Sequence, residues 1–366
     1  MVRRATRIAT LSFILLHSAC GESGSDADGQ ANNVGQSESF SGAVPHIAPG
    51  TAPDTVLKPR RLIGDSLTFG FIDRVGLVGQ HLAVLDTRSE PHLTVVDLQA
   101  SQVVNRLIQN GDGPGEMRQP NWIQTASADP PQAWIYDFGT RRFTLVDLLA
   151  QPDQAVLDQV RLSAEYSLLQ PNWFAGRIVS NGLFVDNGLL VLDRQGGPVQ
   201  AIDVPPPFDS SDAPLPVARR LLNRSYLAVN PSGTRMAAVY QFGNRIDFHL
   251  TSGTRYGSVS GPRETTPRYS ISNGRFAWEE GNEMAYAGVA ATERYVYALF
   301  TGDIHGAREQ NNSRLHVFTW EGDFVKEIDL GFPTSDVAVS SDDGLVYAGI
   351  SIPHPIVAEW SLREVL

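Results

Sequence analysis

The four-residue stretch Gln-Pro-Asn-Trp occurs twice in the chain, at 119–122 and at 170–173, and an apolar residue follows each copy. Its asparagine carries an amide that both donates and accepts hydrogen bonds, and its tryptophan carries an aromatic face with one N–H donor. Proline lacks the N–H that a sheet ladder uses, so it suits the first position of a strand. The pattern therefore predicts two equivalent strands that begin with side chains able to bind a ligand or partner. These candidate binding residues are Asn121, Trp122, Asn172 and Trp173.

A second group of candidates lies in the polar stretch TGDIHGAREQNNS at 301–313. This stretch is longer than a hairpin turn requires. Long loops on a rigid scaffold often carry binding residues. We therefore add His305, Arg308 and Glu309 as candidates for contact with a ligand or partner.

The other polar residues match no catalytic or metal-binding motif. No two histidines have the H-x-H, H-x-x-x-H or H-E-x-x-H spacing, and no G-x-S-x-G elbow is present. The glycine-rich stretch at 111–115 contains a proline and lacks the spacing of both nucleotide-binding fingerprints. The sequence therefore predicts no catalytic residue, no metal ligand and no cofactor, although a site assembled from distant segments would leave no local motif.

Aspartates recur at equivalent strand ends, as at Asp86, Asp137 and Asp193. A structural repeat needs the same residue in each copy, whereas an active site needs a few unique residues. We therefore interpret these aspartates as turn-forming carboxylates that accept hydrogen bonds from nearby backbone N–H groups.

The first twenty residues have the pattern of a targeting segment. Three arginines precede a short apolar run, and Cys20, the only cysteine, follows small residues. The run is too short to cross a bilayer of ~30 Å as a helix. The last three positions of 16–20 resemble the lipobox of bacterial lipoproteins, with a departure at His17, where an aliphatic residue is usual. The resemblance implies a signal peptide over 1–19 and a lipid on Cys20 that attaches the protein to a membrane; an ordinary secretory signal ending in a cysteine is the alternative.

Residues 20–56 form the next segment, which is rich in Gly, Ser, Asp, Asn and Ala. Such a segment buries too little apolar surface to offset its ordering entropy, so we expect a disordered tether after the lipidated cysteine. Gly21 after the cysteine resembles the sorting pattern of enteric lipoproteins, which implies an outer-membrane lipoprotein facing the periplasm or the cell surface. The net charge of −11 argues against nucleic acid as a partner, because phosphate binding needs a basic surface.

From residue 57 onward the hydrophobic pattern has period two. Short β-rich runs are separated by turn residues every eight to twelve positions, and no stretch shows a convincing helical stripe. The chain is therefore predicted to be all-β. The runs group into repeated units that begin near Phe71, Gln119, Gln170, Arg224, Asn282 and Pro333.

Six units of about 52 residues over 57–366 predict a six-bladed β-propeller of four-stranded antiparallel blades. The sequence also indicates how the ring of blades is closed, because VLKPRRLIGD at 56–65 is similar to the end of the first unit, VVNRLIQNGDG at 103–113. We therefore expect an N-terminal strand to supply the outer strand of the last blade and to close the ring. The repeated Gln-Pro-Asn-Trp is then the crossover from one blade to the innermost strand of the next.

The chain resembles the TolB-like six-bladed β-propellers. Many of these are bacterial lipoproteins, and they are related in architecture to NHL-repeat propellers. GDGPGEMRQP at 111–120 is similar to the family's crossover motif, with Met117 where phenylalanine is common. The tail at 313–362 resembles the last two blades, and NPSGTRMAAVY at 230–240 resembles a repeat motif with Ser232 in place of aspartate. The resemblance implies the fold over roughly 57–366 and no agreed enzymatic activity.

Two hypotheses about function follow. The first is a lipid-anchored, non-catalytic binding module of the cell envelope, whose partner is an unidentified envelope protein, glycan or small ligand. The second is an enzyme with its site in the axial channel, such as a calcium-dependent lactonase-like hydrolase or a sugar dehydrogenase. A cluster of oxygen ligands drawn from at least three blades would favour the enzyme. Aromatic and amide side chains at the channel mouth would favour the binding module.

Overall fold

The computed structural model of the chain describes residues 44–48, 50–53, 55–64, 68–163, 168–182, 188–202, 216–307, 310–350 and 354–366. Cys20, Arg308 and Glu309 lie outside these ranges, as do the proposed signal peptide and most of the proposed tether. The helical part of the described residues contains no segment long and apolar enough to cross a membrane.

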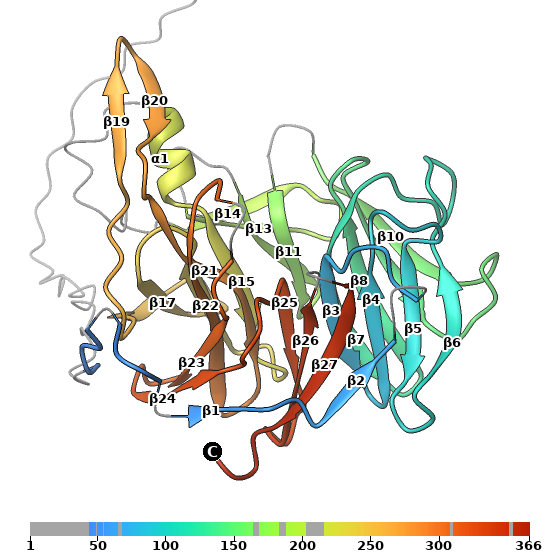
Figure 1. Cartoon of the computed structure of the whole chain (residues 1–366). Coiled ribbons are helices and arrows are strands. Elements are labelled where there is room, and N and C mark those ends of the chain that lie inside the picture. Colours follow the sequence, from blue (N-terminus) through green and yellow to red (C-terminus); the bar gives the residue numbers. More distant parts are fainter. Residues whose placement is uncertain are drawn as a thin grey trace, which may run out of the picture. The chain divides into compact units, whose positions relative to one another are not determined.

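The described strands form six blades, each with four antiparallel strands, so the predicted all-β six-bladed propeller is confirmed (Figure 1). The first three blades are β3 (Arg74–Val78), β4 (His81–Leu85), β5 (Leu93–Asp97) and β6 (Gln102–Leu107); β7 (Pro120–Ala128), β8 (Pro131–Asp137), β9 (Arg142–Asp147) and β10 (Val156–Arg161); and β11 (Leu168–Phe174), β12 (Arg177–Gly182), β13 (Leu189–Leu192) and β14 (Pro198–Ile202). The last three are β15 (Ser225–Val229), β16 (Arg235–Tyr240), β17 (Arg245–Leu250) and β18 (Arg255–Ser260); β21 (Glu283–Ala291), β22 (Tyr295–Ile304), β23 (Arg314–Thr319) and β24 (Phe324–Asp329); and β25 (Asp336–Val339), β26 (Leu345–Ile350), β27 (Ile356–Ser361) and β2 (Arg61–Ile63).

Closure by an N-terminal strand is also confirmed. Strand β2 pairs antiparallel with β27, with Leu62 opposite Ala358, and so completes the sixth blade. The preceding strand β1 (Thr55–Val56) adds a parallel fifth strand to the edge of β24. The N-terminal segment thus covers two sheet edges that would otherwise carry unpaired backbone groups.

The hydrophobic core lies between neighbouring blades. Leu85 of β4 and Ile135 of β8 are fully buried and belong to one cluster that joins the first two blades. The middle strands are buried on both faces, as in β4, where all five residues are buried, whereas outer strands such as β6 expose Val103 and Val104. A single blade therefore has two apolar faces that only its neighbours can cover.

Carboxylates at the ends of second strands fix the crossovers between blades. Asp137 accepts hydrogen bonds from the backbone N–H groups of Arg118 and Gln119, immediately before β7. Asp86 does the same for Phe71, before β3. These contacts confirm the interpretation as turn-forming carboxylates, and they position the start of the inner strands.

Two elements depart from the predicted pattern. A short helix, α1 (Pro216–Leu222), and a hairpin of β19 (Tyr269–Ser272) and β20 (Arg275–Trp278) lie outside the blades (Figure 1). Ala218 and Leu222 of α1 pack against apolar side chains of this hairpin. A seven-residue helix is too short to show a 3.6-residue periodicity, which is why the sequence pattern missed it.

The ring closure depends on one arginine of β2. The guanidinium of Arg61 donates to Oε2 of Glu359 at 2.5 Å, to the carbonyl of Leu98 at 2.6 Å and to Oγ of Ser101 at 2.8 Å. It thereby connects the N-terminal strand, the last blade and the first blade. The side chain of Glu359 is only 4% exposed, whereas that of neighbouring Arg60, which lies 3.7 Å from Glu359, is 66% exposed.

We expect Arg61→Ala to lower the free energy of unfolding by about 2 kcal/mol, because it leaves the buried carboxylate of Glu359 without its main partner. The matched control, Arg60→Ala, removes only an exposed ion pair and is expected to change stability by less than about 0.5 kcal/mol. Chemical denaturation of both variants measures the difference. Equal losses in the two variants would contradict the assigned role of Arg61.

Candidate functional site

The six inner strands surround a cavity of about 890 Å³, referred to here as the axial chamber. Every inner strand contributes to its wall, so the chamber lies on the propeller axis. Its lining includes residues near the starts of these strands, such as Val75 and Asp336, and turns that join the first and second strands of a blade, such as those at Gly79 and Ala175. One lining residue from each inner strand in turn is Val75, Trp122, Asn172, Ala228, Val289 and Val337.

Arg74 of β3 crosses the propeller axis beside the chamber. Its Nε donates to the carbonyl of Asn121 at 3.1 Å, and its Nη1 lies 3.9 Å from Oδ1 of Asp336. Its Cζ is 6.0 Å from the ring centroid of Tyr226. A side chain of the first blade that contacts the second, fourth and sixth blades must occupy the axis. The guanidinium therefore lies beside the end of the chamber that Asp336 lines, called here the inner end.

The carboxyl group of Asp336 lines the chamber next to this guanidinium. It accepts a hydrogen bond from the backbone N–H of Val75 at 3.0 Å. Burial raises the pKa of Asp336 to about 6, against the opposing effects of the Arg74 charge and of backbone N–H groups. The inner end of the chamber thus carries one arginine and one carboxyl group that ionises close to neutral pH.

Stacked aromatic rings form one wall of the chamber. Trp134 of β8 lies between two other rings, with its centroid 4.8 Å from Phe143 and 4.7 Å from Trp173 and interplanar angles of 28° and 22°. Trp173 is the last ring of this stack, lines the chamber and is partly exposed. Trp122 also lines the chamber, and its buried Nε1 has no hydrogen-bond partner among the described residues.

Strands of different blades share no sheet ladder, so side-chain amides make hydrogen bonds between neighbouring inner strands. Oε1 of Gln124 accepts the backbone N–H of Trp173 at 2.6 Å, and its Nε2 donates to the carbonyl of Trp173 at 2.9 Å. In the same way, Oε1 of Gln170 accepts the N–H of Leu227 at 2.9 Å. These bridges connect the second, third and fourth blades around the chamber and hold the backbone of Trp173.

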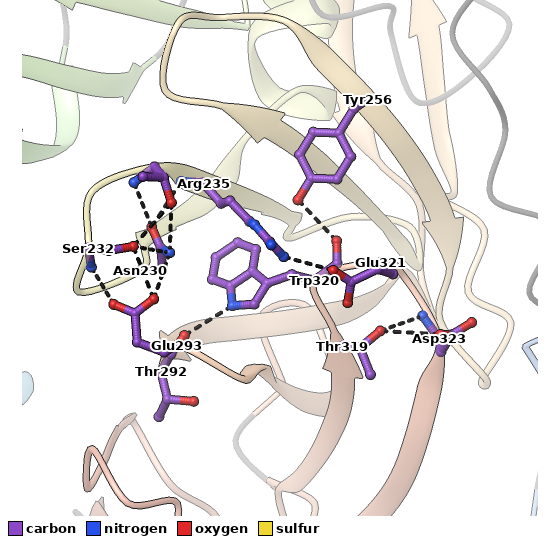
Figure 2. A network of polar contacts seen from close by, with 11 residues as sticks. Asn230, Ser232, Arg235, Tyr256, Thr292, Glu293, Thr319, Trp320, Glu321 and Asp323 are labelled. Atoms are coloured by element: carbon purple, nitrogen blue, oxygen red, sulfur yellow. Dashed lines mark hydrogen bonds and ion pairs between the residues drawn. The ribbon is translucent and has the colours of Figure 1, made fainter.

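The rim of the chamber is tied by Glu293, which follows β21. Figure 2 shows its carboxylate directed at the turn between β15 and β16, where Oε2 accepts from Nδ2 of Asn230 at 3.0 Å and from Oγ of Ser232 at 3.0 Å. Elsewhere on the lining, Arg194 donates to Asp158 at 2.6 Å. The charged groups of the chamber lining and rim therefore have partners.

The structure brings three of the predicted site residues together. Trp122, Asn172 and Trp173 line the axial chamber. Asn121 does not, because its carbonyl faces Arg74 and its Nδ2 donates to the carbonyl of Leu169 at 3.4 Å. All four do lie on inner strands, as expected for crossover residues.

His305 lies away from the chamber. Its ring packs edge-on against Phe242 and Trp278, at centroid distances of 5.7 and 5.6 Å, beside the β19–β20 hairpin. The other two candidates of that loop, Arg308 and Glu309, are outside the described residues. In the described part of the chain, no three His, Cys, Asp or Glu side chains are grouped so that they could hold a metal ion.

The sequence analysis missed three residues of the chamber lining and Arg74 beside it. Gln124 could have been found, since it follows Trp122 by two positions on the same strand and therefore lies on the same side. Arg74, Trp134 and Asp336 carry no local signal. Their importance comes from contacts with blades that are distant in sequence.

Six four-stranded blades around an axial chamber define the chain as a six-bladed β-propeller with a concave site on its axis. The sequence profile of the TolB-like 6-blade propeller-like family matches residues 73–342, and the chain belongs to this family. None of the curated proteins matches the chain in sequence.

Solved structures share the fold at low identity. A member of the DUF4221 family from Bacteroides vulgatus is 10% identical, with a TM-score of 0.56, and the match covers 83% of this chain and 97% of that one. A Bacteroides fragilis protein described as exported is 14% identical, with a TM-score of 0.55, and the match covers 86% of this chain and 97% of that one. At these identities the similarity shows the fold alone.

Asp336→Asn tests the environment of the chamber's inner end. Between about pH 6 and 4 the folded wild-type carboxyl group holds a proton that the unfolded chain has released, so lowering the pH through this window stabilises the wild type. The asparagine variant cannot take up that proton. We therefore expect the unfolding free energy of the wild type to rise relative to the variant by about 2 kcal/mol as the pH falls from 7 to 4.

His249 also changes stability with pH, but it is present in both proteins, so its contribution is the same in each. Burial lowers its pKa to about 4, which destabilises both proteins as the pH falls from about 6.5 and cancels in the difference. Urea denaturation of both proteins at several pH values gives the two curves. A difference that stays constant with pH would show that Asp336 ionises normally.

Proposed function

We propose that this chain is an exported, lipid-anchored β-propeller that acts as a non-catalytic binding module of the cell envelope. The axial chamber carries this proposal. It is a preformed concave site of about 890 Å³, within the ~300–1,000 Å³ range common for ligand pockets, and it combines aromatic walls with a few convergent polar groups. No observation on the described residues favours the enzymatic alternative.

Export and anchoring are supported by the N-terminal sequence. The arginine-rich start, the short apolar run and Cys20 fit a lipoprotein signal, and the polar stretch that follows is long enough to hold the propeller clear of a membrane. The description of the Bacteroides fragilis relative in fold as exported agrees with this part of the proposal.

Blocking the chamber tests the binding proposal. Ala126 of β7 lines the chamber and is exposed, so Ala126→Trp places a large ring in the chamber without displacing core side chains. We expect compounds that raise the melting temperature of the wild type, in a screen of sugars, amino acids, nucleosides and dipeptides, to lose this effect in Ala126→Trp, because a ligand stabilises only the state that binds it.

The matched control is Ala100→Trp, which makes the same substitution at an exposed turn of the first blade, outside the chamber lining. This variant should respond to ligands as the wild type does. Compounds that stabilise Ala126→Trp and the wild type equally would place the binding site elsewhere and would overturn the proposal.

Cys20→Ser tests the anchor. In a Gram-negative host, the full-length wild type is expected in the membrane fraction and labelled by radioactive palmitate, whereas the variant is expected to lose the label and move to the soluble fraction. Equal membrane association of both proteins, without labelling of either, would contradict lipid attachment at this cysteine.

A further inference from the structure

The aromatic stack of the axial chamber ends at an open ring. The ring of Trp134 stacks on Phe143, with the centroids 4.8 Å apart, and on Trp173, with the centroids 4.7 Å apart. Phe143 and Trp134 are buried, at 0% and 4% exposure, whereas Trp173 is partly exposed and lines the chamber. One face of Trp173 is covered by Trp134, and its outer part remains available to a ligand. A flat surface of a ligand can therefore stack on the Trp173 ring.

Both the backbone and the ring of Trp173 are held before a ligand arrives. The side-chain amide of Gln124 binds the backbone N–H and carbonyl of Trp173, at 2.6 and 2.9 Å, and the indole stacks on Trp134 with the centroids 4.7 Å apart. A ring held in this way loses little conformational entropy when a ligand stacks on it. Such preorganisation is typical of a binding surface.

The charges of the chamber favour a neutral ligand. Arg74 faces Asp336 at the inner end, and Arg194 pairs with Asp158 at 2.6 Å on the lining. Of these groups only Asp336 is buried, so a charged ligand at the inner end would leave a buried charge less compensated, whereas the exposed Arg194–Asp158 pair contributes little.

Apart from Asp158, Arg194 and Asp336, the polar side chains of the lining are neutral hydrogen-bonding groups. They are Gln124, Thr125, Ser127, Gln132, Asn172, Asn230, Ser232 and Ser341. A purely apolar aromatic ligand would take water from these groups and return no hydrogen bonds.

We infer that the axial chamber binds a neutral saccharide, with one sugar ring stacked on Trp173 and its hydroxyl groups facing the neutral polar side chains of the lining. This inference rests on the proposed function, because it names the ligand class for the same chamber. A sugar ring presents C–H groups, which are weakly positive, to the negative face of an indole, and its hydroxyl groups both donate and accept hydrogen bonds. It therefore satisfies the open ring face, the neutral charge and the polar lining together.

The test uses the mature chain with glucose, galactose, N-acetylglucosamine, cellobiose, lactose and chitobiose, followed by tryptophan fluorescence and calorimetry. Indole serves as a neutral aromatic probe. We expect at least one saccharide to bind and indole to bind more weakly than that saccharide. Trp173→Ala should weaken saccharide binding roughly tenfold, while Trp173→Phe, which keeps a ring, should retain most of it.

Thermal unfolding verifies that each variant is folded. Ala100→Trp should bind as the wild type does.

The outcomes separate this inference from the proposed function. If indole or another non-saccharide binds and Ala126→Trp abolishes that binding while no saccharide binds, the saccharide inference fails and the chamber remains a ligand site. If a saccharide binds with the same affinity to the wild type, Trp173→Ala and Ala126→Trp, the sugar site lies outside the chamber and both proposals fail. If no saccharide of the panel binds, the inference is overturned, and the wider screen with Ala126→Trp decides the proposed function.

Discussion

The two-sided apolar blade is the constraint on which the rest of this structure depends. Each blade has buried side chains on both faces, and no blade can bury them alone. Stability therefore requires a closed ring in which every face meets a neighbour. The pairing of β2 with β27 and the contacts of Arg61 with the last and first blades are the means by which this chain completes that ring.

Ring closure also creates the axial chamber. The inner strands converge on the axis but belong to different sheets, so they leave a space that is not filled by sheet hydrogen bonds. Side chains bridge the gaps instead, as Gln124 does between the second and third blades and Gln170 between the third and fourth. The same geometry that stabilises the ring thus provides a concave site with preformed walls.

Buried charge in this propeller is placed where blades meet or where strands need to be tied. In the fifth blade, Glu327 lies between Arg263, at 2.6 Å, and His316, at 3.0 Å. Burial acts to raise the pKa of Glu327, but hydrogen bonds from His316 and Arg263 prevail and lower it to about 2. At the axis, Asp336 has only one distant arginine and its pKa is raised instead. The carboxyl group of Asp336 is therefore less fully compensated by positive charge than that of Glu327.

The sequence by itself determined the fold, because period-two strands, recurrent turn residues and a repeat of about 52 residues are local signals that survive without knowledge of long-range contacts. It also indicated Trp122, Asn172 and Trp173, since the repeated crossover marks the start of inner strands. The helix α1 and the β19–β20 hairpin were not predicted from the sequence, because they are short and fall outside the repeat. Only the tertiary structure decided the chamber itself. Arg74 and Asp336 are separated by most of the chain, and Trp134 meets Trp173 across a blade boundary, so their proximity follows from ring closure and from no pattern along the sequence.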